Sequence, residues 1–291
     1  MKLDLNKFLV KPGSKVNLKE HDTAYTAGLT KEEGKKELKK NTKELASMQE
    51  LFWADDRYAL LVVLQAPDAA GKDGAIRHVM SGLNPQGCRV YSYKTPSSKE
   101  WDHDYLWRHY RDLPERGMIG IFNRSHYENV LVTKVNPSFL LSEKLPDVNK
   151  PEDADEQFWN NRYNQINNFE KHIYQNGCRI IKIFLNLSKE EQKERLLDRL
   201  NEKEKNWKFS SDDLKARAQW DQYQEAYEEM MEKTSTEYAP WYIVPADKKF
   251  FARAAIGEII VEHFKRLNLR YPLPESAEQL AKAKEILMSE K

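Results

Sequence analysis

A short segment of the chain combines small residues, a lysine and two acids in a pattern that can bind phosphate. It runs Gln65-Ala-Pro-Asp-Ala-Ala-Gly-Lys-Asp-Gly74 and follows a continuous aliphatic run. The phosphate-loop motif is Gly, four residues, Gly-Lys and then Ser or Thr. Here Ala66 replaces the first Gly and Asp73 the hydroxyl residue, while Gly71 and Lys72 are kept. The segment therefore predicts a loop whose backbone N–H groups and lysine hold an anion.

Asp68 lies within this loop and carries a charge that suits a metal ion. The Ser or Thr of the motif normally helps to hold Mg²⁺, and the chain lacks it. A carboxylate is a hard oxygen ligand, so we predict Asp68 as the Mg²⁺ ligand and, with Lys72, as a catalytic residue. The alternative is a chance Gly-Lys pair at the start of a helix that Asp68 caps. Phosphate contacts are expected from Ala69, Ala70, Gly71, Lys72, Asp73 and Gly74.

A second group of polar residues follows another apolar run. The stretch Gly117-Met-Ile-Gly-Ile-Phe-Asn-Arg-Ser-His-Tyr-Glu128 contains Asn123, Arg124 and, about one helical turn later, Glu128. An arginine can neutralise charge on a transferring phosphoryl group, and a carboxylate can hold metal-bound water. We therefore predict these three as catalytic residues. The alternative is a helix cap with a surface Arg–Glu pair, and His126 is interpreted as a packing or hydrogen-bonding residue.

A charged helical stretch farther along the chain has the composition of a lid. Arg195 and Arg199 are four residues apart, so both side chains share one helix face. Lys203, Lys205 and Lys208 follow within the next turns. Such a mobile basic cover would exclude water from a phosphoryl group in transfer. The alternative is a solvated helix whose arginines pair with neighbouring acids.

Two further basic residues follow the second predicted strand. Lys94 and Arg108 lie where nucleotide kinases place the groups that bind the acceptor. We predict them, together with Asn123 and Arg124, as nucleotide-binding residues.

Composition limits the classes of protein to which the chain can belong. Of its 291 residues 40% are hydrophobic, and no apolar run approaches the length of a bilayer span. Basic and acidic residues nearly balance, 47 against 46, whereas a general nucleic-acid binder usually has a basic surplus. Two cysteines form neither a disulfide framework nor a zinc site. We expect a cytoplasmic protein that binds neither nucleic acid nor membrane.

The order of predicted elements indicates the fold. Apolar runs that suit buried strands alternate with helical patterns, which is typical of a parallel sheet covered by helices on both faces. In such sheets ligands bind at the carboxyl ends of the strands. The predicted strands are 58–65, 88–92, 118–123, 179–187 and 241–244. The predicted helices are 30–53, 71–80, 98–110, one from 125, one ending near 176, and 188–203, 210–234 and 248–268.

We predict one large domain with short additions at both ends. Residues 1–29 are read as an N-terminal extension and 30–270 as an α/β phosphotransferase domain. Its lid is expected at about 195–217. Residues 271–291 are read as a C-terminal tail.

Taken together, these segments resemble the family-2 polyphosphate kinases. The resemblance rests on Ala-Pro-Asp-Ala-Ala-Gly-Lys-Asp-Gly, on Phe-Asn-Arg-Ser-His-Tyr-Glu, and on Arg-Leu-Leu-Asp-Arg through Trp-Lys-Phe-Ser. It extends from about Thr30 to Leu269. Many members have Asp at the position of Asn123, and the version with Asn is similar to the third class, whose members phosphorylate AMP and ADP. Asn is the weaker Mg²⁺ ligand, and Glu128 is expected to compensate.

The resemblance implies a thymidylate-kinase-like fold, that is, a P-loop kinase core with a five-stranded parallel sheet and a helical lid. It also implies Mg²⁺ as cofactor, polyphosphate with AMP, ADP and ATP as partners, and a homo-oligomer, either a dimer or a tetramer. Lys72, Arg195 and Arg199 would hold polyphosphate, with Lys208 nearby in the lid. Asp68, Asn123 and Arg124 would organise the metal and the acceptor phosphate.

Two other functions fit the same sequence. An ATP-dependent kinase of a nucleotide or small metabolite would use the same fold. A polyphosphate-binding protein without turnover would need the anion-binding loop but not Asp68, so the presence of Asp68 favours an enzyme.

Overall fold

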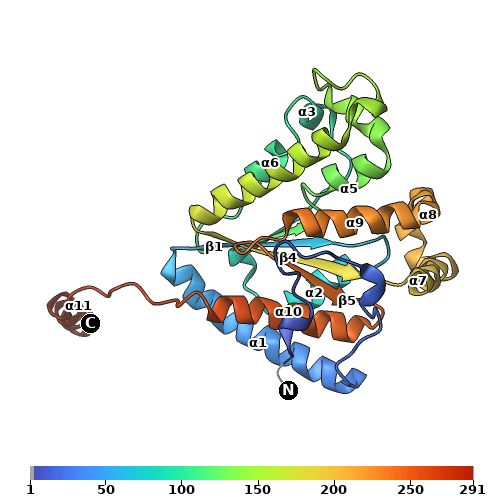
Figure 1. Cartoon of the computed structure of the whole chain (residues 1–291). Coiled ribbons are helices and arrows are strands. Elements are labelled where there is room, and N and C mark those ends of the chain that lie inside the picture. Colours follow the sequence, from blue (N-terminus) through green and yellow to red (C-terminus); the bar gives the residue numbers. More distant parts are fainter. Residues whose placement is uncertain (1–2, 291) are drawn as a thin grey trace.

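The computed structural model describes residues 3–290, in which five parallel strands form a sheet between two layers of helices (Figure 1). The strand order is β2-β3-β1-β4-β5, with every neighbouring pair parallel. This arrangement confirms the predicted α/β fold class. The strands are β1 (Ala59–Gln65), β2 (Cys88–Ser92), β3 (Ile119–Asn123), β4 (Cys178–Asn186) and β5 (Trp241–Pro245).

Alternate residues of the central strand β1 pack into two different hydrophobic layers, one on each face of the sheet. Leu60, Val62 and Leu64 join the layer beneath α1 (Lys31–Asp55), α2 (Lys72–Val79) and α10 (Lys249–Lys265). This division follows from the period of two that side chains have along a strand. Because both faces of β1 are buried, the run contains no polar residue before Gln65.

The opposite face of the sheet packs against three other helices. Leu61 and Val63 of β1 lie in this second layer, which contains side chains of all three helices. The helices are α5 (Glu128–Val135), α6 (Glu156–Gln175) and α9 (Trp220–Thr234). Figure 1 shows them above the sheet, with α1 and α10 below it.

The register of the sheet brings the two chemically interesting loops together. Leu64 of β1 pairs with Asn123 of β3, so these strands end at the same level. The pairing continues one residue farther, because the N–H of Arg124 donates to the carbonyl of Leu64 at 3.1 Å. The phosphate-loop segment after β1 and the polar segment after β3 are therefore neighbours at the carboxyl edge of the sheet.

A helical projection follows β4 at the same edge. It consists of α7 (Lys189–Asn201), the 3₁₀ turn η6 (Lys203–Lys208) and α8 (Ser211–Ala218). The predicted continuous helix 210–234 is wrong, because the chain breaks between α8 and α9. Gln219, at the break, leaves the helical conformation with φ −95° and ψ 22°, and its side chain donates to Asn136.

Two other predicted helices differ from those observed. The predicted helix 98–110 is two short ones, α3 (Ser98–Trp101) and α4 (Trp107–Arg111). Between them the Asp104 carboxylate accepts a hydrogen bond from the N–H of Leu106, a local turn that competes with helix continuation. The helix expected from residue 125 begins at Glu128, after a turn. The remaining 3₁₀ turns are η1 (Leu5–Lys7), η2 (Leu18–Glu20), η3 (Pro85–Gly87), η4 (Pro137–Glu143) and η5 (Pro151–Asp153).

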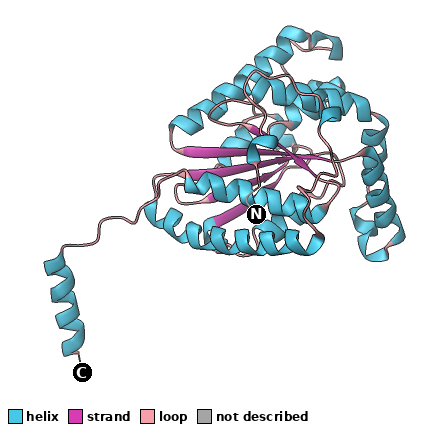
Figure 2. Cartoon of the chain, turned by 60° about the horizontal axis from the view of Figure 1, so that its bottom comes forward, coloured by secondary structure: helices cyan, strands magenta, loops and turns pink. Residues whose placement is uncertain are grey.

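The N-terminal segment contacts the sheet, whereas the C-terminal helix does not. The N-terminal segment lies along β5, where Leu9 forms an antiparallel bridge with Tyr242 and covers that edge. At the other end, α11 (Ala277–Ser289) stands away from the body on an extended segment (Figure 2). Cys178 is buried, whereas Cys88 is half-buried because β2 is an edge strand. Within the described residues, no helix is long and apolar enough to cross a membrane.

Candidate active site

The segment between β1 and α2 forms a tight loop around the start of α2. Ala69 has φ +63° and Gly71 has φ +102°, so both backbones are in the left-handed region. That region is accessible to glycine without strain and is rare for alanine. The strained alanine indicates that surrounding contacts hold the loop in this shape. α2 begins directly after Gly71, at Lys72.

Lys72 folds back over the loop rather than pointing into solvent. Its Nζ donates to the carbonyl of Ala66 at 3.0 Å and lies 3.4 Å from that of Pro67. Burial, together with the nearby charge of Arg124, lowers the pKa of Lys72 to about 8, although the charge of Asp68 opposes the shift. The amine can therefore lose its proton slightly above neutral pH.

An ion-pair cluster joins the two loops. The Arg124 guanidinium donates to Oδ1 of Asp68 at 2.8 Å and lies 3.9 Å from Oε2 of Glu128. Its pKa is raised, first by the charge of Glu128 and also by that of Asp68. Arg124 itself has φ +62°, a left-handed backbone that turns its side chain out of the strand direction. The structure thus brings together three of the predicted catalytic residues.

Asn123 makes the second connection between the loops. Its Nδ2 donates to Oδ1 of Asp73 at 2.6 Å and lies 3.4 Å from Oγ of Ser92. Asp73 replaces the hydroxyl residue of the phosphate-loop motif, so the first turn of α2 and the end of β3 are held at a fixed separation.

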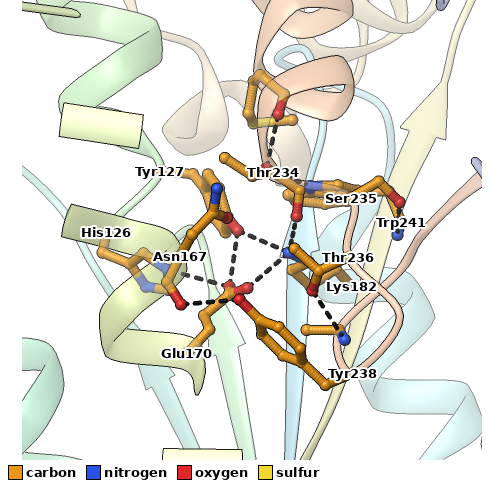
Figure 3. A network of polar contacts seen from close by, with 12 residues as sticks. His126, Tyr127, Asn167, Glu170, Lys182, Thr234, Ser235, Thr236, Tyr238 and Trp241 are labelled. Carbon is orange, nitrogen blue, oxygen red and sulfur yellow. Dashed lines mark hydrogen bonds and ion pairs between the residues drawn. The ribbon is translucent and has the colours of Figure 1, made fainter. Parts of the chain in front are cut away.

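A buried polar network anchors the segment that follows Arg124 (Figure 3). The ammonium of Lys182 donates to Glu170 at 2.6 Å, to the Tyr127 hydroxyl at 2.9 Å and to the carbonyl of Thr234 at 2.7 Å. Tyr127 in turn donates to Glu170 at 2.7 Å. His126 lies 3.4 Å from Glu170, and burial lowers its pKa, which fits the packing role predicted for it. The network ties the β3–α5 segment to α6, β4 and the end of α9.

An open pocket lies beside the ion-pair cluster. Asp68, Arg124 and Glu128 line one side of it. The other walls come mainly from α5, α8 and α9 and are largely apolar or aromatic. They include Leu131, Val132, Ala216, Trp220, Tyr223 and Tyr227.

Gln224 adds an unpaired polar group to the pocket wall. Its Nε2 is shielded from solvent and has no hydrogen-bond partner within residues 3–290. A buried amide without a partner costs free energy, so a ligand acceptor in the pocket would remove that cost.

The lid residues occupy different environments. Arg199 pairs with Asp213 at 3.0 Å, and the Lys208 side chain lies over the ring of Trp207. Arg195 is only 5% exposed and points beneath the phosphate loop, where Nη1 donates to the carbonyl of Ala70 at 2.8 Å. The expected open basic face shared by both arginines is therefore absent from this arrangement. Burial of one guanidinium under the loop is the reason.

Lys94 and Arg108 are connected through the backbone. Arg108 is buried and donates to the carbonyl of Lys94 at 2.9 Å, and its guanidinium lies 4.0 Å from Glu100. Burial lowers the pKa of Arg108, while several carboxylates, Glu128 among them, oppose the shift. The Lys94 side chain is exposed at the surface.

The chain also matches a known protein family over most of its length. The sequence profile described as Polyphosphate kinase 2 matches residues 28–271. The chain belongs to this family.

Relatives and solved structures within the polyphosphate kinase 2 family align over nearly the full chain. An "ADP-polyphosphate phosphotransferase" of Rhodopseudomonas palustris is 49% identical over 273 residues, which cover 94% of this chain and 93% of the relative. An "AMP/ADP-polyphosphate phosphotransferase" of Meiothermus ruber is 42% identical over 277 residues, 94% and 98% of the two chains. The crystal structure of polyphosphate kinase 2 from Arthrobacter aurescens TC1 is similar with a TM-score of 0.85, 38% identity and 94% coverage of each chain.

The oxygen donors around the phosphate loop fit the divalent metal that phosphotransferases of this kind use. Residues 3–290 contain no group of three or more His, Cys, Asp or Glu side chains that could by itself hold a metal ion. Mg²⁺, however, is commonly held by one or two carboxylates together with substrate phosphates and water. Asp68, Asp73 and Glu128 offer carboxylates at the two loops, and Asn123 offers a carbonyl oxygen.

Several residues of this family member's site carried no recognisable signal in the sequence. Gln192 donates to the carbonyl of Asp68 at 3.1 Å, and Asp213 pairs with Arg199. The pKa of Asp213 is raised by burial and by the charge of Asp68. These residues, like the aromatic wall of α9, lie more than a hundred positions from the phosphate loop. Only the helical period of α9 could have indicated that Trp220, Tyr223 and Tyr227 share a face.

Proposed function

We propose that this chain is a Mg²⁺-dependent polyphosphate:nucleotide phosphotransferase that moves the terminal phosphoryl group of polyphosphate to AMP and ADP, and back. The observation that carries the proposal is the meeting of the phosphate loop with the Asp68–Arg124–Glu128 cluster at one edge of an aromatic-walled pocket. The printed activities of the Rhodopseudomonas and Meiothermus relatives support it.

The phosphate loop is the donor side of the proposed reaction. The N-terminus of α2 and the Lys72 ammonium favour negative charge at this position. Polyphosphate would bind here and displace the Lys72 amine from the carbonyls of Ala66 and Pro67, which are weaker partners than a phosphate oxygen.

The pocket is the acceptor side. The nucleotide base would pack against Trp220 and Tyr223, and the unpaired amide of Gln224 would bind a polar edge of the base. The phosphate of the nucleotide would then reach Arg124, which also lines the pocket. Arg108, whose guanidinium interacts with the charge of Glu128, would supplement the positive charge there.

The chemistry needs positioning more than proton transfer. A nucleotide phosphate oxygen is already ionised at neutral pH and attacks the terminal phosphorus in line, so a strong general base is unnecessary. Arg124 and Lys72 neutralise the charge that spreads over the transferring group. Asp68 would hold Mg²⁺, which supplies further charge neutralisation when bound.

The projection formed by α7, η6 and α8 is the proposed lid, and its closure would exclude water from the reacting phosphoryl group. Water is the competing acceptor, so an exposed site would hydrolyse polyphosphate. We further propose a cytoplasmic location and a homo-oligomer, a dimer or a tetramer.

Product analysis tests the proposed function directly. The purified chain is incubated with polyphosphate, Mg²⁺ and either AMP or ADP in the absence of ATP. Formation of ADP and ATP is expected. Phosphorylation that appears only when ATP is added would indicate an ATP-dependent kinase, and polyphosphate binding without products would indicate a non-enzymatic binder.

A further inference from the structure

The Arg195 side chain has all of its hydrogen-bond donors engaged by protein atoms. A guanidinium has five N–H groups and cannot accept. Nε donates to Glu191 at 2.8 Å. The four remaining bonds go to backbone carbonyls, those of Ala69 (3.2 Å), Ala70 (2.8 Å), Ala246 (2.6 Å) and Asp247 (3.1 Å).

Two of these carbonyls belong to the phosphate loop, and their orientation determines where the loop amides point. The peptide bonds are trans, so the carbonyl of Ala70 and the N–H of Gly71 point in opposite directions within their shared plane. Because Arg195 holds that carbonyl beneath the loop, the Gly71 N–H faces the other side, where an anion would bind. The same guanidinium holds the carbonyl of Ala69, whose left-handed φ of +63° requires outside support.

The other two carbonyls belong to Ala246 and Asp247, which directly follow β5 and are distant from the phosphate loop in sequence. Asp247 is itself fixed, because its carboxylate accepts from the N–H of Ser188 at 2.9 Å and from the Thr23 hydroxyl at 2.7 Å. Arg195 therefore connects α7, the phosphate loop and the turn between β5 and α10 through one rigid, planar group.

We propose that Arg195 is a positioning residue that holds the phosphate loop in its anion-binding form, rather than a ligand of polyphosphate. The proposal rests on the phosphate loop of the proposed function, but it does not depend on which acceptor is used. It differs from the role of Arg199, whose guanidinium is 22% exposed and pairs with a carboxylate of α8.

The fork geometry gives a specific expectation for Arg195→Lys. Lysine keeps the charge but has three donors on one atom and cannot bridge four carbonyls from two segments. If Arg195 positions the loop, Arg195→Lys and Arg195→Met should both lower kcat/KM for polyphosphate by roughly a hundredfold, as expected for a small displacement of reacting groups. If Arg195 binds phosphate as a charge, Arg195→Lys should retain activity within about tenfold of wild type while Arg195→Met loses it.

Amide hydrogen exchange of the substrate-free protein provides the second measurement. We expect faster exchange at residues 66–74 in both Arg195 variants, because the loop carbonyls lose their partner. Lys193→Met removes one charge from the exposed side of the same helix and should change neither exchange nor turnover. Free guanidinium should partly restore the turnover of Arg195→Ala by filling the vacated site. This rescue experiment tests the same role if Arg195→Met folds poorly.

Near-normal turnover of Arg195→Lys together with unchanged loop exchange would overturn the proposal. The exchange measurement needs no substrate, so it can support or reject the positioning role even if wild-type protein fails to make ADP or ATP from polyphosphate. That latter result would contradict the proposed function alone.

Discussion

The Nδ2 amide of Asn123 donates to Oδ1 of Asp73 over 2.6 Å and so joins the end of β3 to the first turn of α2. The bond requires a donor at residue 123, because a carboxylate there would face the carboxylate of Asp73. The amide therefore links the two loops at a point where two carboxylates would repel each other. This role explains why a neutral side chain is stable at a position where a metal-binding acid was the more obvious expectation.

Asn123→Asp should leave an active enzyme whose stability and rate depend more strongly on Mg²⁺. Two carboxylates in contact repel each other, and a divalent cation between them removes the repulsion. Without Mg²⁺ we expect the variant to have a lower melting temperature than wild type. Adding Mg²⁺ should raise the melting temperature of the variant more than that of wild type. The measurements are thermal unfolding and initial rate against Mg²⁺ concentration, with AMP and ADP as separate acceptors. The exchanged pair Asn123→Asp/Asp73→Asn restores one donor and one acceptor, so its stability without Mg²⁺ should recover.

Lys72 should give the enzyme an upper pH limit. Its lowered pKa, about 8, means that the free enzyme loses this charge as the pH rises through 8. We expect kcat/KM for polyphosphate to fall above that pH, whereas kcat should fall only at higher pH, because bound polyanion raises the pKa again. Lys72→Ala should lower kcat/KM by at least about a hundredfold without unfolding the protein. A flat kcat/KM profile up to pH 9.5 would contradict the assignment.

The sheet and the phosphate loop could be predicted from sequence because their signals are local. The run 58–65 has no charged residue, and Gly71-Lys72 follows after a five-residue loop. The signals for the strand, the turn and the start of the helix therefore lie within sixteen residues. The strand order follows only in part, but parallel strands place their carboxyl ends at one edge whatever the order.

Contacts between distant segments could not be predicted in this way. The i,i+4 spacing places Arg195 and Arg199 on one side of α7. It does not reveal that the Arg195 guanidinium binds the carbonyls of residues 246 and 247 beneath the phosphate loop. The pocket wall likewise depends on how α9 packs against α5. Neither of these arrangements has a signal within a short window of sequence.

Asp68→Asn should nearly abolish transfer. The substitution preserves size but removes the charge that pairs with Arg124 at 2.8 Å and that suits Mg²⁺. We expect a kcat lower by at least about a hundredfold that raised Mg²⁺ restores only in part. The readout is initial rate against Mg²⁺ concentration, with polyphosphate binding measured separately. Unchanged Mg²⁺ dependence would reduce Asp68 to a structural residue of the loop.

Removing one partner of the Lys182–Glu170 pair should destabilise the protein more than replacing both partners with apolar residues. Both side chains are fully buried, so Glu170→Gln leaves the ammonium of Lys182 in the core without its counter-ion and should lower the free energy of unfolding by about 3–5 kcal/mol. Replacing both partners, as in Lys182→Met/Glu170→Leu, should cost less than either single change. Urea unfolding of the two single variants and the double variant gives the coupling energy. Additive losses would show that the two groups do not depend on each other.

Gln224 and Trp220 should control which nucleotide is accepted. A glutamine amide can bind adenine through a donor–acceptor pair, and stacking on an aromatic ring is insensitive to the identity of the base. Gln224→Leu should therefore lower the preference for AMP over GMP, whereas Trp220→Ala should raise the KM of both nucleotides and leave the KM of polyphosphate unchanged. Gln222→Leu makes the same chemical change on the exposed side of α9 and should behave like wild type. If Gln224→Leu keeps the wild-type ratio of kcat/KM for the two nucleotides, its unpaired amide does not face the base, and the pocket recognises the acceptor through stacking and phosphate contacts alone.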